Sequence, residues 1–94
     1  MDEIIKCVEA DIEFIKNNTD NAYILKCCDI LSIKLQDIKD KKYKTEEVVY
    51  GFCDKMINYD IHNMRSVPEL SDELYTKIDE LSTHAEQIKT AYFE

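Results

Sequence analysis

The sequence has very little of the residues that build tight turns: one glycine and one proline in 94 residues, and no tryptophan. Turn-rich sandwiches, barrels and glycine-rich phosphate loops need more glycine and proline than this, so the composition argues against all three. Hydrophobic residues make up 45% of the chain and charged residues 34%, which provides both a core and a polar surface to cover it. We therefore predict a single domain over residues 1–94, with an all-helical fold.

Positive charge is also scarce, because 20 acids face 12 bases and the net charge is −8. Residues 1–20 carry six acids and two lysines (−4), residues 21–65 seven acids and eight bases (+1), and residues 66–94 seven acids and two lysines (−5). Nucleic acid and anionic membranes are disfavoured as partners, because both require clustered Lys and Arg. At most, a peripheral membrane association is expected. The acidity fits a basic protein partner, and it equally fits an ordinary solubility charge.

The chain shows no secretory signal, since residues 1–20 carry eight charges and no apolar segment of the kind that such signals contain. No apolar run approaches the ~18 residues of a membrane span. We expect a cytoplasmic protein whose four cysteines, Cys7, Cys27, Cys28 and Cys53, stay reduced. Cys27 and Cys28 would lie about 100° apart on a helix, a poor arrangement for one metal ion. Core packing is the expected role of the cysteines, with a metal or redox role as the alternative.

Apolar residues recur at helical spacing in four segments, for which we predict helices over about 2–16, 21–42, 45–59 and 67–92. In the second, Ile24, Cys28, Leu31, Leu35 and Ile38 repeat at 4-3-4-3 spacing. Such helices with short connectors favour an antiparallel up-and-down four-helix bundle. Gly51 interrupts the third segment, and a close helix–helix approach is one reason to keep a glycine there.

Several residues are expected to mark the helix ends. Thr19 or Asp20 would cap the second helix and Thr45 the third. Ser66-Val67-Pro68-Glu69 has the pattern of a capping box with proline in the first turn of the fourth helix. Residues 60–65 would then form the longest irregular connector.

No catalytic or metal-binding motif is present. His62 and His84 are 22 residues apart without metal-ligand spacing, so both are expected on the surface or in a connector. The many carboxylates of 67–92 are expected along a solvated helix face and not as a catalytic pair in a concave site. One glycine builds neither a nucleophile elbow nor a phosphate loop. We expect no enzyme activity, no cofactor and no metal.

The remaining candidates are residues for contact with a protein partner. The connector is rich in apolar and aromatic side chains, which would either be exposed for binding or tuck onto the core. The predicted contact set lies in this connector and at the end of the last helix: Tyr59, Ile61, His62, Met64, Arg65, Lys89, Tyr92 and Phe93.

The order of these elements is similar to that of the immunity proteins of pediocin-like (class IIa) bacteriocins, of the enterocin A immunity type. The likeness rests on Ile24-x₆-Leu31-x₃-Leu35 and a lysine-rich exit ending Lys42-Tyr43. It continues with Met56-Ile57-Asn58-Tyr59 and with Glu69, Asp72-Glu73-Leu74 and Leu81-Ser82.

The resemblance implies a cytosolic four-helix antiparallel bundle that protects the producing cell from its own pore-forming bacteriocin. It implies action from the inner membrane face, on the complex of bacteriocin with the mannose phosphotransferase permease. It also implies that the C-terminal half selects the bacteriocin, here the 60–65 connector and the end of the last helix.

A second hypothesis remains open: a small acidic helical inhibitor or adaptor, of the kind that phages and viruses encode, binding a basic site on a host protein. Either protein would be a monomer or a dimer, because the wide apolar stripes exceed what one small bundle readily buries.

Overall fold

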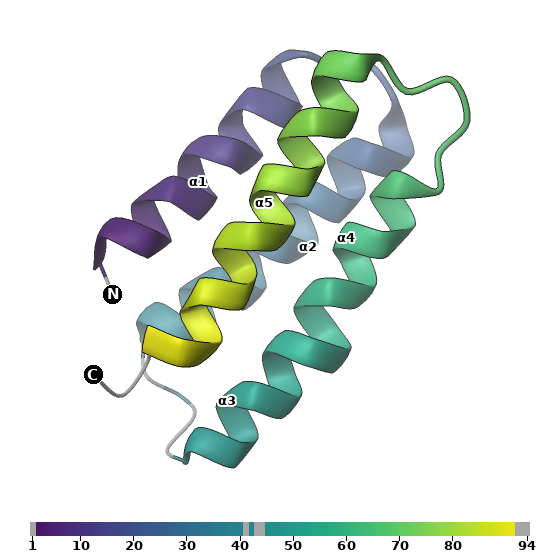
Figure 1. The fold of residues 1–94 in the computed structure, drawn as a ribbon. Coiled ribbons are helices and arrows are strands. Elements are labelled where there is room, and N and C mark those ends of the chain that lie inside the picture. The colour runs from purple at the N-terminus through teal and green to yellow at the C-terminus, as the bar shows by residue number, and fades with distance from the viewer. Residues whose placement is uncertain (1, 41, 43–44, 92–94) are drawn as a thin grey trace.

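The computed structural model describes residues 2–40, 42 and 45–91. Its elements are α1 (Asp2–Asn17), α2 (Ala22–Lys39), α3 (Glu46–Phe52), the π-helical segment η1 (Cys53–Ile57), α4 (Asn58–Arg65) and α5 (Asp72–Ala91). α3, η1 and α4 follow one another without a break and run as one continuous rod in Figure 1. This third rod and the helices α1, α2 and α5 make four rods in the described part of the chain. No β-strand occurs in this part of the chain. The predicted all-α antiparallel bundle is confirmed.

The rods alternate in direction and close into a ring (Figure 1). α1 packs against α2 and α5, and α4 packs against the same two helices on the other side. The bundle measures 39 × 22 × 18 Å. The first and last helices, which lie at opposite ends of the sequence, are therefore neighbours in space.

Side-chain hydrogen bonds cap the N-termini of α2 and α3. Asn21 caps α2 with Oδ1, which accepts hydrogen bonds from Tyr23 N (2.9 Å) and Ile24 N (3.1 Å). The expected cap at Thr19 or Asp20 is wrong by one or two positions, although Thr19 Oγ1 accepts from Asn21 N. The predicted cap at Thr45 is confirmed by a hydrogen bond from Val48 N. α2 ends at Lys39, before the expected position 42.

The expected connector over 60–65 is helical, which corrects the prediction for this segment. α4 continues to Arg65, and the loop that follows it precedes α5, which begins at Asp72 and not at residue 67. Ser66 closes α4, so the predicted capping box does not form. Glu69 within this loop has a φ of 63°, a left-handed conformation that costs a non-glycine residue about 1–2 kcal/mol.

The π-helical segment explains how the third rod remains one helix although its buried apolar residues are spaced too widely for a regular α-helix. The apolar side chains that the structure shows buried in this rod are Val49, Cys53, Ile57, Ile61 and Met64, at spacings of 4-4-4-3. Each step of four residues overshoots one α-helical turn by about 40°. In η1 the amide of Asn58 donates to the carbonyl of Cys53, five residues earlier, and this wider turn takes up the excess. The buried stripe therefore keeps facing the core up to Met64.

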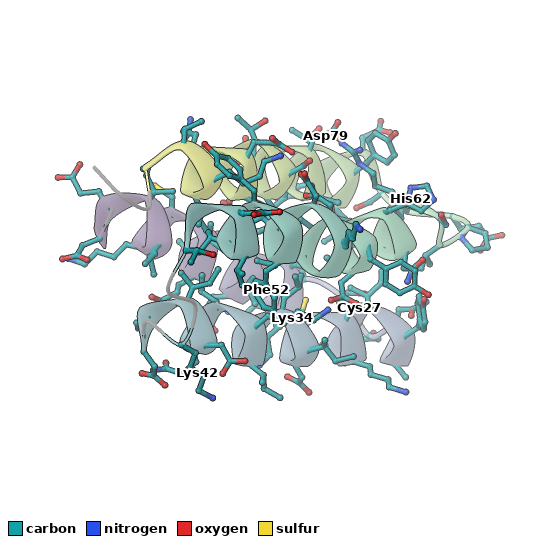
Figure 2. The ribbon with its side chains drawn as sticks, turned by 90° about the horizontal axis from the view of Figure 1, so that it is seen from below. Cys27, Lys34, Lys42, Phe52, His62 and Asp79 are labelled. Atoms are coloured by element: carbon teal, nitrogen blue, oxygen red, sulfur yellow. The ribbon has the colours of Figure 1, made fainter. Side chains whose placement is uncertain are left out.

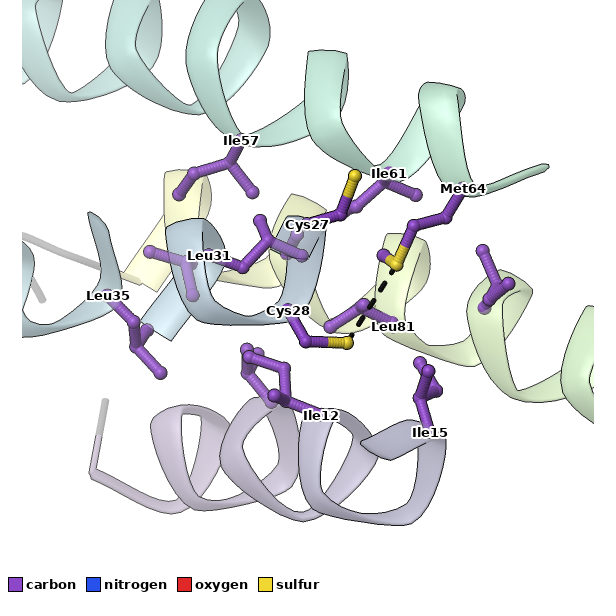
Figure 3. Packing of buried hydrophobic residues seen from close by; sticks show 14 of the residues in the cluster. Ile12, Ile15, Cys27, Cys28, Leu31, Leu35, Ile57, Ile61, Met64 and Leu81 are labelled. Carbon is purple, nitrogen blue, oxygen red and sulfur yellow. Dashed lines mark hydrogen bonds between the residues drawn. The ribbon is translucent and has the colours of Figure 1, made fainter. Parts of the chain in front are cut away.

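The core is mostly isoleucine and leucine with three cysteine thiols among them. Figure 3 shows two of these, Cys27 and Cys28. Cys27, Cys28 and Cys53 are buried, as predicted for residues on apolar stripes. Cys7 is exposed on α1, so it does not share that role. A Cβ atom added at Gly51 would meet nothing within 4 Å, so the expectation that this glycine permits a close helix approach is wrong.

Candidate functional site

The structure divides six of the eight predicted contact residues into three groups. Tyr59 and His62 are exposed on α4. Ile61 and Met64 are completely buried, which corrects their assignment to a contact surface: because 60–65 is helical, every third or fourth residue of it points inward. Arg65 and Lys89 form the ion pairs described next. The other two, Tyr92 and Phe93, lie outside the described residues.

The ion pairs of Arg65 and Lys89 tie α5 to the third rod. Arg65 pairs with Asp79. Lys89 pairs with Asp54 and, at 2.9 Å, with Glu86. Hydrogen bonds from Lys89 to Asp54 first, and to Glu86 second, raise the pKa of Lys89 to about 12. Arg65 and Lys89 therefore hold α5 against the third rod, whereas the sequence predicts them as partner-binding residues.

Two aspartates are buried, and the sequence analysis singled out neither of them. Asp11 on α1 is 4% exposed. Its Oδ2 lies 2.5 Å from Nδ1 of His84 on α5, and its Oδ1 lies 3.7 Å from Nζ of Lys77 on the same helix. His84, expected on the surface, therefore bridges α1 and α5 through a side chain that is only partly exposed.

Asp60 on α4 is 5% exposed and pairs with Lys34 of α2, which is itself mostly buried. A buried carboxylate is costly unless it is paired, and each of these two has its cationic or hydrogen-bonding partner on a neighbouring helix. The only sequence signal was the position of each aspartate beside a buried stripe: Asp11 next to Ile12 and Asp60 next to Ile61.

The buried thiols have low reactivity. Burial raises the pKa of Cys28 and of Cys53 to about 11. Burial, followed by the charge of Asp60, also raises the pKa of Cys27. A thiol attacks or binds metal as its thiolate, so these three are poor nucleophiles near neutral pH. Figure 3 shows the sulfur of Cys28 turned toward the thioether of Met64, 4.0 Å away.

A groove of about 220 Å³ runs between α1 and α2. Ile12 and Leu35 contribute its apolar lining, and the other residues that line it are polar: Glu9, Glu13, Lys16, Ser32, Gln36 and Lys39. Ion pairs cross between the helices at Lys39–Glu9 and Lys16–Asp29. Both lysines that line the groove therefore pair with carboxylates of the facing helix and help to hold α1 against α2. The described residues also contain no group of three His, Cys, Asp or Glu side chains placed to hold a metal ion.

Apolar side chains gather on the outside of two adjacent rods. We call this surface the α2–α4 face and define it by six residues: Tyr23, Ile30, Ile33, Val48, Phe52 and Tyr59. Tyr23, Ile33, Val48 and Tyr59 are exposed, and Ile30 and Phe52 are half-buried. Figure 2 looks onto the third rod, with α2 below it, and shows Phe52, Lys34 and Cys27 along the seam between them.

Net charge is distributed unequally around the ring of helices. α1 and α5 each carry five acids and two lysines. α2 carries three lysines against two acids, and residues 46–65 carry four acids against two bases. Because α1 packs against α5, the fold gathers the two acidic segments into one half of the molecule, with nearly balanced charge in the other half.

A scan of the chain against protein-family models gave no match, and neither did searches of curated proteins and of solved structures. Across the described ranges, no helix combines the length and the apolar character needed to cross a bilayer.

Proposed function

We propose that this chain is a non-enzymatic protein that acts by contact with a protein partner through its outer surface. One observation carries the proposal: among the described residues, the buried ionisable groups bridge helices or remain as uncharged thiols, and none of them lines the groove between α1 and α2. Asp11 and Asp60 have partners on neighbouring helices, and burial keeps Cys28 protonated. An enzyme needs shifted groups that converge on a substrate-sized space, whereas a binding protein needs a rigid scaffold with a distinctive exterior.

Within this class, the function that we propose is that of a cytosolic immunity protein. It would protect its producer from a pore-forming class IIa bacteriocin by contact with the bacteriocin–permease complex. The order and directions of the helices agree with what the resemblance implies. Tyr59 and His62, which remain exposed in the C-terminal half of the chain, are the residues through which we expect the contact.

The test is to express the gene in a sensitive indicator strain and to measure survival against a panel of class IIa bacteriocins. Survival should rise clearly against at least one member of the panel. A double variant, Tyr59→Ala with His62→Ala, should lose this protection while keeping its helical content. Unchanged sensitivity to every bacteriocin, at a verified level of folded protein, would refute the immunity function.

A second candidate is supported by the acidic half of the molecule formed by α1 and α5. A small acidic protein with its negative charge on one side fits a basic site on a host protein. Such binding should weaken steeply as salt rises, because it depends on exposed charges. The measurement is capture of host proteins on immobilised chain at increasing salt. Partners that stay bound regardless of salt would exclude this candidate.

A further inference from the structure

The α2–α4 face is unusually apolar for the outside of so small and so charged a protein. Among the described residues, five large hydrophobic side chains are exposed, and four of them belong to this face: Tyr23, Ile33, Val48 and Tyr59. Ile33 is 65% exposed and Tyr59 is 63% exposed. Single exposed apolar residues need no explanation, but apolar residues gathered on one face mark an interaction site.

The six residues point the same way because of their spacing. Tyr23, Ile30 and Ile33 are separated by seven and three residues, so they share one side of α2. Val48 and Phe52 are four residues apart on α3, and Tyr59 follows seven residues later, beyond η1.

The two rows lie beside each other along the seam. The ion pair between Lys34 and Asp60 and the contact between Cys28 and Met64 both join α2 to α4. At one end of the seam, the pKa of Tyr23 is raised first by desolvation and then by the neighbouring Cys27 and Tyr59, so the two tyrosines share one environment. The two apolar rows therefore meet in one patch at the end of the seam where Tyr23 and Tyr59 lie.

Charge decides which kind of molecule can cover this patch. Two copies of a chain with a net charge of −8 repel each other, and the repulsion is strongest where α1 and α5 would meet. On the α2–α4 face, Asp60 is neutralised by Lys34 and Asp37 by Lys42. The same two rods carry three exposed lysines and three exposed acids: Lys26, Lys39, Lys55, Asp29, Glu47 and Asp54. A contact made through this face turns both acidic halves outward, to the greatest separation that the bundle allows.

The area also matches. One long side of the molecule, with its apolar and polar residues together, measures 39 Å by 18–22 Å, or about 700–860 Å². A standard stable interface buries about 800 Å² on each partner. A two-fold axis pairs one such surface with itself, which is the commonest symmetry of homodimers.

From these observations we infer that the α2–α4 face binds a second copy of this chain, forming a two-fold symmetric dimer. Two rods of one copy lie against two rods of the other, and Ile33 and Tyr59 are buried at the contact. The acidic half made of α1 and α5 stays on the outside of both copies. Because Tyr59 belongs both to this face and to the contact proposed for the immunity function, a partner that binds through Tyr59 competes with the dimer. The dimer is measured without that partner, so either proposal can fail alone.

The test is the mass of the protein in solution, by sedimentation velocity and light scattering, from about 1 µM to about 1 mM, a range that brackets a moderate dimer affinity. The mass should rise from 11.1 kDa toward twice that value. Because the symmetric contact would bury two unpaired carboxylates, Ile33→Glu should raise the dimer Kd by at least about a hundredfold.

Tyr75→Glu is the matched control, because Tyr75 is exposed to a similar degree but lies on α5. It should change Kd by less than about threefold. Because Ile33 and Tyr75 are both exposed on the single chain, both variants should keep the helical circular dichroism of the parent chain.

Three results would overturn the inference. The parent chain could stay at 11.1 kDa up to the highest concentration. Tyr75→Glu could dissociate the dimer as strongly as Ile33→Glu does. Alternatively, association could weaken steeply as salt rises, which would indicate a contact between the acidic half of one copy and the lysines of another.

Discussion

Replacing Ile61 by alanine tests the helical course of residues 60–65, on which much of the third rod depends. Ile61 is 2% exposed, while its neighbour His62 is exposed on the same turn of α4. If the segment were an irregular connector, the two side chains would contribute similarly little to stability. The structure instead places one in the core and the other in water.

The expected loss of stability follows from what the substitution removes. An isoleucine-to-alanine change deletes three carbon atoms, and each buried methylene is worth about 0.8 kcal/mol. The cavity left behind adds about 1 kcal/mol or more when the surroundings cannot collapse. Ile61→Ala should therefore lower the free energy of unfolding by about 3–4 kcal/mol. For a domain of this size, the melting temperature falls by about 4–8 °C for each kcal/mol.

Urea unfolding followed by circular dichroism measures the effect, with His62→Ala as the control. The control should stay within about 0.5 kcal/mol of the parent chain, and the m-value should not change in either variant. Equal losses in the two variants, or a loss below about 1 kcal/mol for Ile61→Ala, would contradict the helical structure of this segment.

Four further predictions follow from burial and backbone conformation. Asp60→Ala breaks a mostly buried ion pair with Lys34 and should cost about 3 kcal/mol in urea unfolding. Recovery is expected when Lys34→Met is added, and an additive loss would argue against the pair. Cys7 should react quickly with a thiol reagent at neutral pH while Cys28 reacts only as fast as the protein opens. Because folding raises the pKa of Cys28 from 9.0 to about 11, its contribution to stability is full below about pH 9 and is lost as the pH rises toward 11, so a melting temperature that climbs over this interval would be the wrong sign. Glu69→Gly relieves a left-handed conformation and should raise the free energy of unfolding by about 0.5–1 kcal/mol, which a lowered melting temperature would exclude.

The helices themselves could be predicted because their apolar periods are long and regular. The 4-3-4-3 spacing of α2 matches the α-helix closely, and Ile24, Leu31 and Ile38 are buried as it predicts. The third rod could not be followed to its end by the same reasoning. Its spacing between Val49 and Ile61 fits an α-helix only if one turn is widened, and nothing in residue propensity announces a π-helical turn.

The candidate site was harder to predict than the fold because it depends on which helices become neighbours. The pairing of Asp11 with His84 spans 73 residues, and the sequence holds no signal for it beyond an aspartate next to an apolar stripe. The place of Arg65 and Lys89 in the chain predicts a binding role, but each pairs with a carboxylate on the neighbouring rod. The uneven charge along the chain was visible, yet it becomes an acidic half of the molecule only because α1 packs against α5.

The widened turn in the third rod has a consequence for how this chain tolerates change in length. One residue between Cys53 and Ile57 is surplus to a heptad repeat: without Lys55, the buried positions of the rod would fall at 4-3-4-3 instead of 4-4-4-3. A single-residue deletion, which ordinarily rotates the rest of a helix out of register, would here turn η1 into a plain α-helix and leave Ile61 and Met64 facing the core. The third rod therefore tolerates the loss of one residue and still presents the same side chains to the core.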